Sequence, residues 1–233
     1  MQKDMSGNRK GSLLKIYDFG LQEYQSVLNL QKKYFQTLIE AKTTGESSFN
    51  EILLIGEHYP VITYGRHANQ NNILQEESFL THRNIKIHHI ERGGDVTFHG
   101  PGQLIAYPIC DLSLHSMGVK NFVTLLEESI IRLLAIYDLV GERIEGATGV
   151  WLGKGSENER KICAIGIKCS RFCTMHGLAL NVNTDLTGFS YINPCGFINK
   201  GVTSIANELG YSVDMNKIKR EFSDIFLCLI LSL

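Results

Sequence analysis

Three stretches of the sequence combine reactive side chains with glycines in a way that suits group-transfer chemistry. The first is ERGGDVTFHGPGQ (91–103), in which Arg92 can bind an anion and His99 can act as an acid, a base or a hydrogen-bond donor. The adjacent Gly93 and Gly94 let backbone N–H groups approach a ligand closely. Taken alone, the stretch is equally well explained as a tight hairpin that carries a hydrogen-bonded histidine.

The other two stretches read RKICAIGIK (160–168) and MHGLALNVN (175–183). Lys161 opens an apolar run, and a lysine at a strand end is usually a solvated edge residue. If its amine points inward instead, it lies in a low dielectric and can stabilise an anion such as a thiolate. His176 precedes a glycine, but in isolation it is better explained as a core or turn histidine.

A cysteine in a tight turn is the candidate nucleophile. Cys195 lies in INPCGF (192–197), between a proline that fixes its own φ and a glycine that tolerates unusual backbone angles. A nucleophilic thiol needs a nearby cation or base that favours the thiolate, and Lys161, His99 and His176 are the candidates. A lone loop cysteine is more often inert than catalytic, so this turn by itself leaves both interpretations open.

The motifs of the common cofactor and metal sites are missing. Gly93 and Gly94 do not form a GxGxxG fingerprint, and LGKGS (152–156) lacks the earlier glycine of a phosphate loop. Cys169 and Cys173 make a C-x₃-C pair that supplies half a zinc site, but no second Cys or His pair completes it. We therefore expect no cofactor and no metal.

The composition fits a soluble globular protein, and the length allows one large domain or two small ones. The chain has 233 residues, of which 43% are hydrophobic and 20% charged, with a formal net charge of −1. Basic residues between 154 and 171 alternate with glutamates, so we expect no nucleic-acid surface. The N-terminus lacks an apolar signal region and the C-terminal apolar run is too short for a membrane span. We expect a cytoplasmic protein with reduced thiols.

The elements that must position these residues follow from hydrophobic periodicity. Apolar residues at helical spacing predict helices over 21–41 and 119–139, and shorter helices over 203–209 and 214–230. Thr43 to Asn50 and Thr184 to Phe197 are expected to be loops. Strands occur in runs flanked by helices, without strict βαβ alternation, which predicts an α+β or mixed α/β fold. The predicted strands are two within 51–65, broken at Pro60, and 85–90, 96–99, 103–109, 149–152, 161–168 and 177–182.

Taken together, the stretches resemble one family. RGGDVTFHGPGQLIAYPI, then RKICAIGIK followed by TMHGLALNVN, then INPCG are similar to the lipoyl(octanoyl) transferases, in the same order from about Gly65 to about Ser204. Three long blocks in register are highly specific. The resemblance implies the biotin/lipoate protein ligase-like fold, a single domain (1–233) with a mixed sheet flanked by helices and an acyl pocket over the sheet.

The resemblance also implies a reaction and its partners. An octanoyl group moves from octanoyl-acyl carrier protein to Cys195 as a thioester, and then to a lysine ε-amine on a lipoyl domain. The implied acceptors are the acyltransferase subunits of 2-oxoacid dehydrogenases and the H protein of glycine cleavage. Lys161 is implied as the partner that stabilises the thiolate and moves a proton. Thioester exchange is nearly isoenergetic and aminolysis is downhill, so no ATP is required.

The substrate contacts of the family carry over to three short segments. The implied substrate-binding residues are Arg92, Gly93, Gly94, Asp95, Val96, Thr97, Phe98, His99, Ala164, Ile165, Gly166, Gly177, Leu178 and Ala179.

Three alternatives remain open at this stage. An ATP-dependent lipoate-protein ligase shares the fold, but the loop ending HGPGQ and the presence of Cys195 favour the transferase. A non-catalytic lipoyl-domain-binding protein would be free to lose Cys195 and Lys161, and both are present. A cysteine hydrolase that pairs Cys195 with His176 lacks the expected sequence context.

Overall fold

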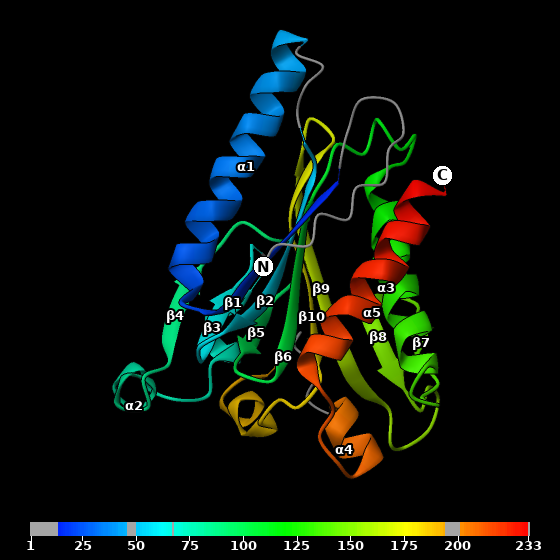
Figure 1. The fold of residues 1–233 in the computed structure, drawn as a ribbon. Helices are drawn as coiled ribbons and strands as arrows, with labels where there is room; N and C mark the ends of the chain where they lie inside the picture. The colour runs from blue at the N-terminus through cyan, green and yellow to red at the C-terminus, as the bar shows by residue number, and fades with distance from the viewer. Residues whose placement is uncertain (1–13, 46–49, 67, 194–200, 233) are drawn as a thin grey trace.

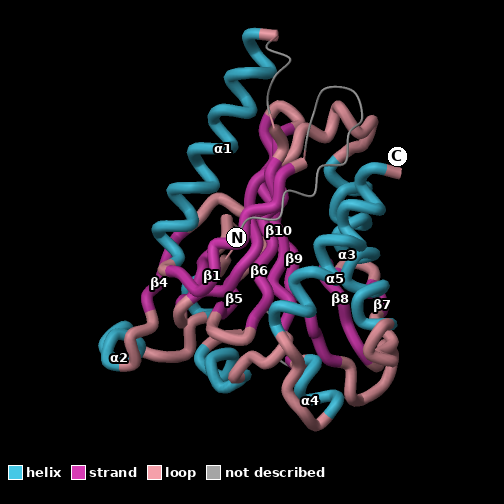
Figure 2. Tube along the Cα trace, viewed as in Figure 1, coloured by secondary structure: helices cyan, strands magenta, loops and turns pink. Residues whose placement is uncertain are grey.

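A mixed sheet of eight strands forms the centre of the molecule (Figures 1 and 2). The structure is a computed structural model that describes residues 14–45, 50–66, 68–193 and 201–232. The strand order is β1 (Lys15–Gln22), β2 (Ile52–His58), β6 (Gln103–Ile109), β10 (Cys173–Asn181), β9 (Arg160–Ser170), β8 (Ala147–Leu152) and β7 (Glu142–Ile144). β11 (Gly201–Val202) pairs with the start of β9. The β1–β2 and β9–β11 pairs are parallel, and the other pairs are antiparallel.

A second, three-stranded sheet carries the glycine-rich stretch. Its order is β4 (Lys86–His89), β3 (Val61–Tyr64) and β5 (Val96–His99), with β4 parallel and β5 antiparallel to β3. The 3₁₀ turn at Gln70–Asn72 and the short helix α2 (Glu77–His82) lie between β3 and β4 in the chain. Residues 90–95 connect β4 and β5, and on the way they touch β9 of the large sheet.

Helices cover both faces of the large sheet (Figure 1). α1 (Tyr24–Thr44) lies on one face, and α3 (Val119–Ala135) and α5 (Met215–Leu231) pack together on the other. The short helix α4 (Ile205–Leu209) precedes α5. None of the helices in the described residues is long and apolar enough to cross a membrane.

Strands buried on both faces explain the near-continuous apolar runs of the sequence. Successive side chains of a strand point to opposite faces. In β6, Leu104 and Ala106 join the core under α3 and α5, whereas Ile105 and Tyr107 join the core under α1. The same division is seen in β2 and β10. Such strands lack the apolar–polar alternation of a half-exposed sheet, because both faces are covered.

The expected mixed α/β fold with flanking helices is confirmed, and the differences are local. The prediction missed β1, α2 and β7, which are short or largely solvent-facing and so carry little periodicity. The expected loop from Thr184 contains a 3₁₀ turn at Leu186–Tyr191, which begins where Asp185 caps the Thr187 N–H. The expected helix over 119–139 ends at Ala135, and α1 extends to Thr44 beyond the expected loop start.

Candidate active site

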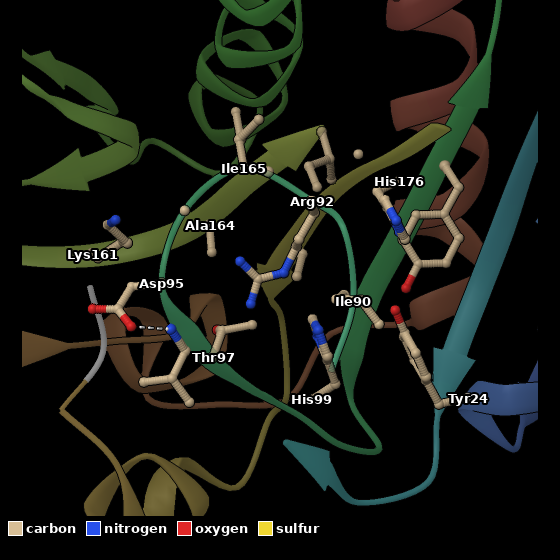
Figure 3. A pocket seen from close by; sticks show the side chains of 17 residues that line it. Tyr24, Ile90, Arg92, Asp95, Thr97, His99, Lys161, Ala164, Ile165 and His176 are labelled. Carbon is tan, nitrogen blue, oxygen red and sulfur yellow. Dashed lines mark hydrogen bonds between the residues drawn. The ribbon is translucent and has the colours of Figure 1, made fainter. Parts of the chain in front are cut away.

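The predicted substrate contacts converge on a cavity between the two sheets (Figure 3). Its empty space of about 510 Å³ includes volume that is open to solvent. Every predicted substrate-binding residue lines it except Gly93 and Phe98, and Lys161 lines it as well. The lining also includes His176, which the sequence offered as a candidate partner of the thiol, and three residues that the sequence did not single out: Tyr24, Ile90 and Tyr107.

Glycines bring the segment 90–95 directly against β9. The Gly93 N–H donates to the Ile167 carbonyl at 2.9 Å. A Cβ added at Gly166 would lie 2.6 Å from the Gly93 carbonyl oxygen, so the two backbones approach too closely for any side chain there. Gly94 has φ of +86°, a conformation that favours glycine. The glycine-rich stretch is therefore needed for this close approach.

Two of the predicted segments of substrate contacts lie on neighbouring strands and pair with each other. Residues 164–166 of β9 and 177–179 of β10 face each other in antiparallel register. The pairs are Gly166–Gly177, Ile165–Leu178 and Ala164–Ala179. Together the two segments form the floor of the cavity on the face of the large sheet that carries α1.

Phe98 and Gly93 are the two predicted substrate contacts that do not line the cavity, and the fold explains both. Thr97 and His99 face the cavity from β5, whereas Phe98 lies between them and points to the other side. There its ring meets Phe189 edge-on, with centroids 5.7 Å apart. Gly93 contributes its backbone to the crossing with β9 rather than to the cavity lining.

Arg92 places a positive charge in the cavity wall. One guanidinium nitrogen donates to the carbonyl and the hydroxyl of Thr63 at 2.9 and 3.0 Å, and another donates to the Gly93 carbonyl at 3.0 Å. The side chain is almost fully buried. These hydrogen bonds hold the guanidinium at the cavity wall, beside the loop.

His99 is held neutral and in one tautomer. The Gln103 amide nitrogen donates to the Phe98 carbonyl and to the Asn181 amide oxygen, so the Gln103 oxygen must face His99 Nδ1, 2.7 Å away. Nδ1 therefore carries the proton, and Nε2 accepts from the Thr63 hydroxyl at 3.2 Å. Burial, followed by the nearby His58, lowers the pKa of His99 to about 3.

Lys161 is buried at one end of the cavity and is not a solvated edge residue. Its ammonium donates to the Thr148 carbonyl at 3.1 Å and lies 4.6 Å from the centroid of the Trp151 ring. Figure 3 shows it near Asp95, away from Tyr24 and His176. The amine therefore lies in a low-dielectric environment that suits interaction with an anion.

Cys195 lies outside the described residues, but the described residues on both sides of it are anchored at the cavity. The Asn193 N–H donates to the Asn72 carbonyl at 2.8 Å, and the Asn72 side chain donates to Asp95 at 2.5 Å. On the other side, Val202 pairs with Lys161, and the Thr203 N–H donates to the Lys161 carbonyl at 3.0 Å.

Aromatic side chains lie at the far end of the cavity, beside Ile90. Tyr24 is buried, and its hydroxyl has no hydrogen-bond partner within the described part of the chain. The Tyr107 hydroxyl contacts His58 Nε2 at 3.0 Å. Burial, followed by the charge of Arg92, lowers the pKa of His176 to about 3. Tyr24 lies more than 60 residues before the nearest motif, so no sequence signal connected it to the site.

Neither Cys163 nor the Cys169–Cys173 pair lies in an arrangement that indicates catalysis or metal binding. Cys163 is fully buried in the core, and burial raises the pKa of its thiol. Cys169 and Cys173 lie on either side of the β9–β10 turn. Among the described residues, no group of three or more His, Cys, Asp or Glu side chains is placed to hold a metal ion.

Sequence comparisons find close relatives along nearly the whole chain. The family model described as the lipoyl protein ligase A/B catalytic domain matches residues 23–227. The octanoyltransferase of Parabacteroides distasonis is 49% identical over 214 residues, which cover 91% of this chain and 96% of that protein. The octanoyltransferase of Alkaliphilus metalliredigens is 41% identical over 218 residues, which cover 91% of this chain and 95% of that protein.

Solved structures share the fold at low sequence identity. A bipartite lipoate protein ligase from Thermoplasma acidophilum superposes with a TM-score of 0.64 at 15% identity, covering 94% of this chain and 83% of that one. The biotin protein ligase from Aquifex aeolicus, in complex with biotin and ATP, gives a TM-score of 0.54 at 10% identity, with 94% and 71% covered. At these identities the likeness concerns the arrangement of strands and helices alone.

Proposed function

The chain belongs to the family of the lipoyl protein ligase A/B catalytic domain, and from this premise we propose that it is an octanoyltransferase. Its substrate is an octanoyl thioester on acyl carrier protein. Its product is an octanoyl amide on a lysine of a lipoyl domain, as in 2-oxoacid dehydrogenase acyltransferase subunits or the glycine-cleavage H protein. The relatives named octanoyltransferases at 49% identity support the acyltransferase assignment.

The proposed reaction has two steps through Cys195. The Cys195 thiolate attacks the carbonyl carbon of the carrier thioester, the carbon–sulfur bond to the carrier breaks, and the carrier thiolate takes up the proton that the Lys161 ammonium gives up. The lysine amine of the acceptor then attacks the Cys195 thioester. An amide forms, Cys195 leaves as a thiolate, and the amine gives up one proton.

Lys161 is the group that supports both steps. As an ammonium it stabilises the thiolate, and as an amine it accepts the proton from the attacking lysine. The observation that carries this role is its burial at the end of the cavity where residues 193 and 202 lead into the segment of Cys195. His99 is not proposed to move the proton, because its Nδ1–H is committed to Gln103 and its pKa is near 3.

The octanoyl chain is proposed to lie along the apolar floor of the cavity. The side chains of Ala164 and Ala179 and the backbone of Gly166 and Gly177 line it, and each buried methylene contributes about 0.8 kcal/mol. Arg92 and backbone N–H groups near the crossing of 90–95 with β9 supply positive potential toward the thioester oxygen.

Intact-mass spectrometry tests the proposal directly. Mixed with octanoyl-acyl carrier protein in the absence of ATP, the protein should gain one octanoyl group that hydroxylamine removes. Cys195→Ser should gain no such hydroxylamine-labile adduct. Addition of a lipoyl domain should discharge the adduct onto that domain. An adduct that persists in Cys195→Ser and remains labile to hydroxylamine would exclude the proposed nucleophile.

Lys161→Met separates chemistry from binding. The variant keeps a long apolar side chain over Trp151 but loses the charge and the proton acceptor. We expect single-turnover acylation to slow by about 10²-fold or more, with a much smaller change in affinity for the octanoyl carrier. Equal acylation rates for the two proteins would remove Lys161 from the mechanism.

A further inference from the structure

The far end of the cavity is closed from the protein surface by a thin wall, and we propose that Ile90 and His176, which form it, set the length of the acyl chain that the enzyme accepts. This inference rests on the proposed function, because it assigns a specificity role within the same site. It concerns the end of the cavity opposite Lys161.

Figure 3 shows how the labelled side chains are arranged from one end of the cavity to the other. Lys161 and Asp95 lie at one end of the cavity, Ala164 and Arg92 lie in the middle, and His176 with Ile90 and Tyr24 lies at the other end. With the thioester carbonyl beside Lys161, the methyl end of the chain points toward Ile90 and His176.

An outer groove lies immediately behind these two residues. It encloses about 1020 Å³, partly open to solvent, and runs between α1 and the β9–β10 hairpin. Ile90 and His176 line both this groove and the cavity, and the two linings share no other residue. The two side chains are therefore the partition between the cavity and the groove.

The backbone holds this partition in place. His176 has φ of +61°, which is unfavourable for a residue with a side chain. Its N–H is fixed by the side-chain oxygen of Gln31, 3.0 Å away on α1, and Gln31 is fully buried. The Ile90 N–H donates to the Tyr64 carbonyl at 2.9 Å. A longer acyl chain therefore meets two anchored residues rather than a mobile loop.

The surface behind the partition would accept further methylene groups. Leu28, Phe35 and Met175 give the groove an apolar floor, while Lys32 and Gln36 belong to its polar side. Removing the side chain of Ile90 or His176 joins the cavity to the apolar floor of the outer groove. In such a variant, the extra methylene groups of a chain longer than octanoyl can be buried against this floor, which the native protein prevents.

The test compares acyl carriers loaded with eight-carbon and twelve-carbon chains. For Ile90→Ala and His176→Gly we expect the ratio of kcat/KM for the twelve-carbon donor over the eight-carbon donor to rise at least about tenfold, since even one methylene changes discrimination by about that much. Glycine suits the backbone at 176, so His176→Gly avoids strain. Gln36→Ala, which alters the groove but not the partition, should keep the native ratio.

Each outcome bears on a different claim. Native protein that transfers octanoyl, together with partition variants that keep the native chain-length ratio, would overturn the role of Ile90 and His176. Native protein that transfers no acyl group would instead refute the proposed function. Because the readout is a ratio within one protein, partial loss of folding lowers both rates equally and leaves the ratio unchanged.

Discussion

His99 shows how neighbours distant in sequence determine the state of one side chain. Its two ring nitrogens contact Gln103 and Thr63, and Gln103 is in turn oriented by Asn181 on β10. Asn181 donates to the Thr203 carbonyl, and the Thr203 N–H donates to the Lys161 carbonyl. A buried hydrogen-bond chain thus connects the cavity histidine with the backbone of the cavity lysine, and such satisfied networks rigidify a core.

We therefore expect His99 to remain neutral at every pH at which the protein is folded and active. Its imidazole resonances, assigned with a His99→Gln variant, should not titrate between pH 8 and about 5, because the pKa is near 3. His115 is the internal control. Burial opposes its charge, but hydrogen bonds from its ring to Glu51 raise its pKa above the ordinary value. A midpoint near 6.5 for His99 would contradict the tautomer argument.

Among single residues, those in the three sequence motifs could be predicted to lie near one site, whereas those at the far end of the cavity could not. Arg92 and His99 stand beside glycines, and Lys161 opens an apolar run, and the sequence displays these features directly. Tyr24 and Ile90 lie in ordinary apolar patterns, and only the packing of α1 and the small sheet brings them to the cavity. Whether Lys161 faced solvent or the interior depended on the burial of β9, which the sequence left open.

At the scale of elements, the crossing between residues 90–95 and β9 is the contact on which the site depends. Gly166→Ala would insert a Cβ 2.6 Å from the Gly93 carbonyl oxygen, so the backbone itself would have to shift to relieve the contact. We expect a loss of about 1–3 kcal/mol in the free energy of unfolding, measured by urea denaturation, and a loss of octanoyl transfer.

Gly93→Ala is the matched control from the other side of the same crossing. Its Cβ would meet its nearest neighbour, the Ile167 carbonyl oxygen, at 3.5 Å, an ordinary van der Waals distance. The stability should change by less than about 1 kcal/mol. Equal destabilisation by the two alanines would show that the close approach does not limit position 166.

The strands and long helices were predictable because each buries a continuous apolar face. Their partners were not, since a strand buried on both faces shows no alternation to fix its register. The pairing of 164–166 with 177–179 is one consequence, because the residues were predicted as contacts but not as neighbours. β1 lacks buried residues apart from Phe19, and for that reason it gave no sequence signal.

For the whole molecule, three buried histidines predict a sharp loss of stability in mild acid. Burial lowers the pKa of His58 to about 4 and those of His99 and His176 to about 3. In the unfolded chain each returns to about 6.5. Their stabilisation is therefore complete above pH 6.5 and is lost progressively as the pH falls toward 3. Between pH 6 and 5, these three groups by themselves make unfolding take up about three protons, which lowers the free energy of unfolding by about 4 kcal/mol per pH unit.

Urea denaturation at several pH values between 6 and 5 measures this proton uptake. His176→Gly should lower it by about one proton, because one of the three groups is removed. Most of the carboxyl groups of the chain titrate below this window, so they contribute little to the slope. A free energy of unfolding that stays flat from pH 6.5 to 5 would contradict the burial of these histidines.

The glycines at the crossing of the two sheets have a consequence for how this enzyme can diverge. At Gly166 the backbone of β9 lies against the backbone of Gly93, whereas Ile90 and His176 lie between the cavity and the outer groove. On the proposal made above, the close approach of the backbones and the depth of the cavity are therefore set by different residues. Single substitutions at Ile90 or His176 would then change the accepted chain length without altering the end beside Lys161.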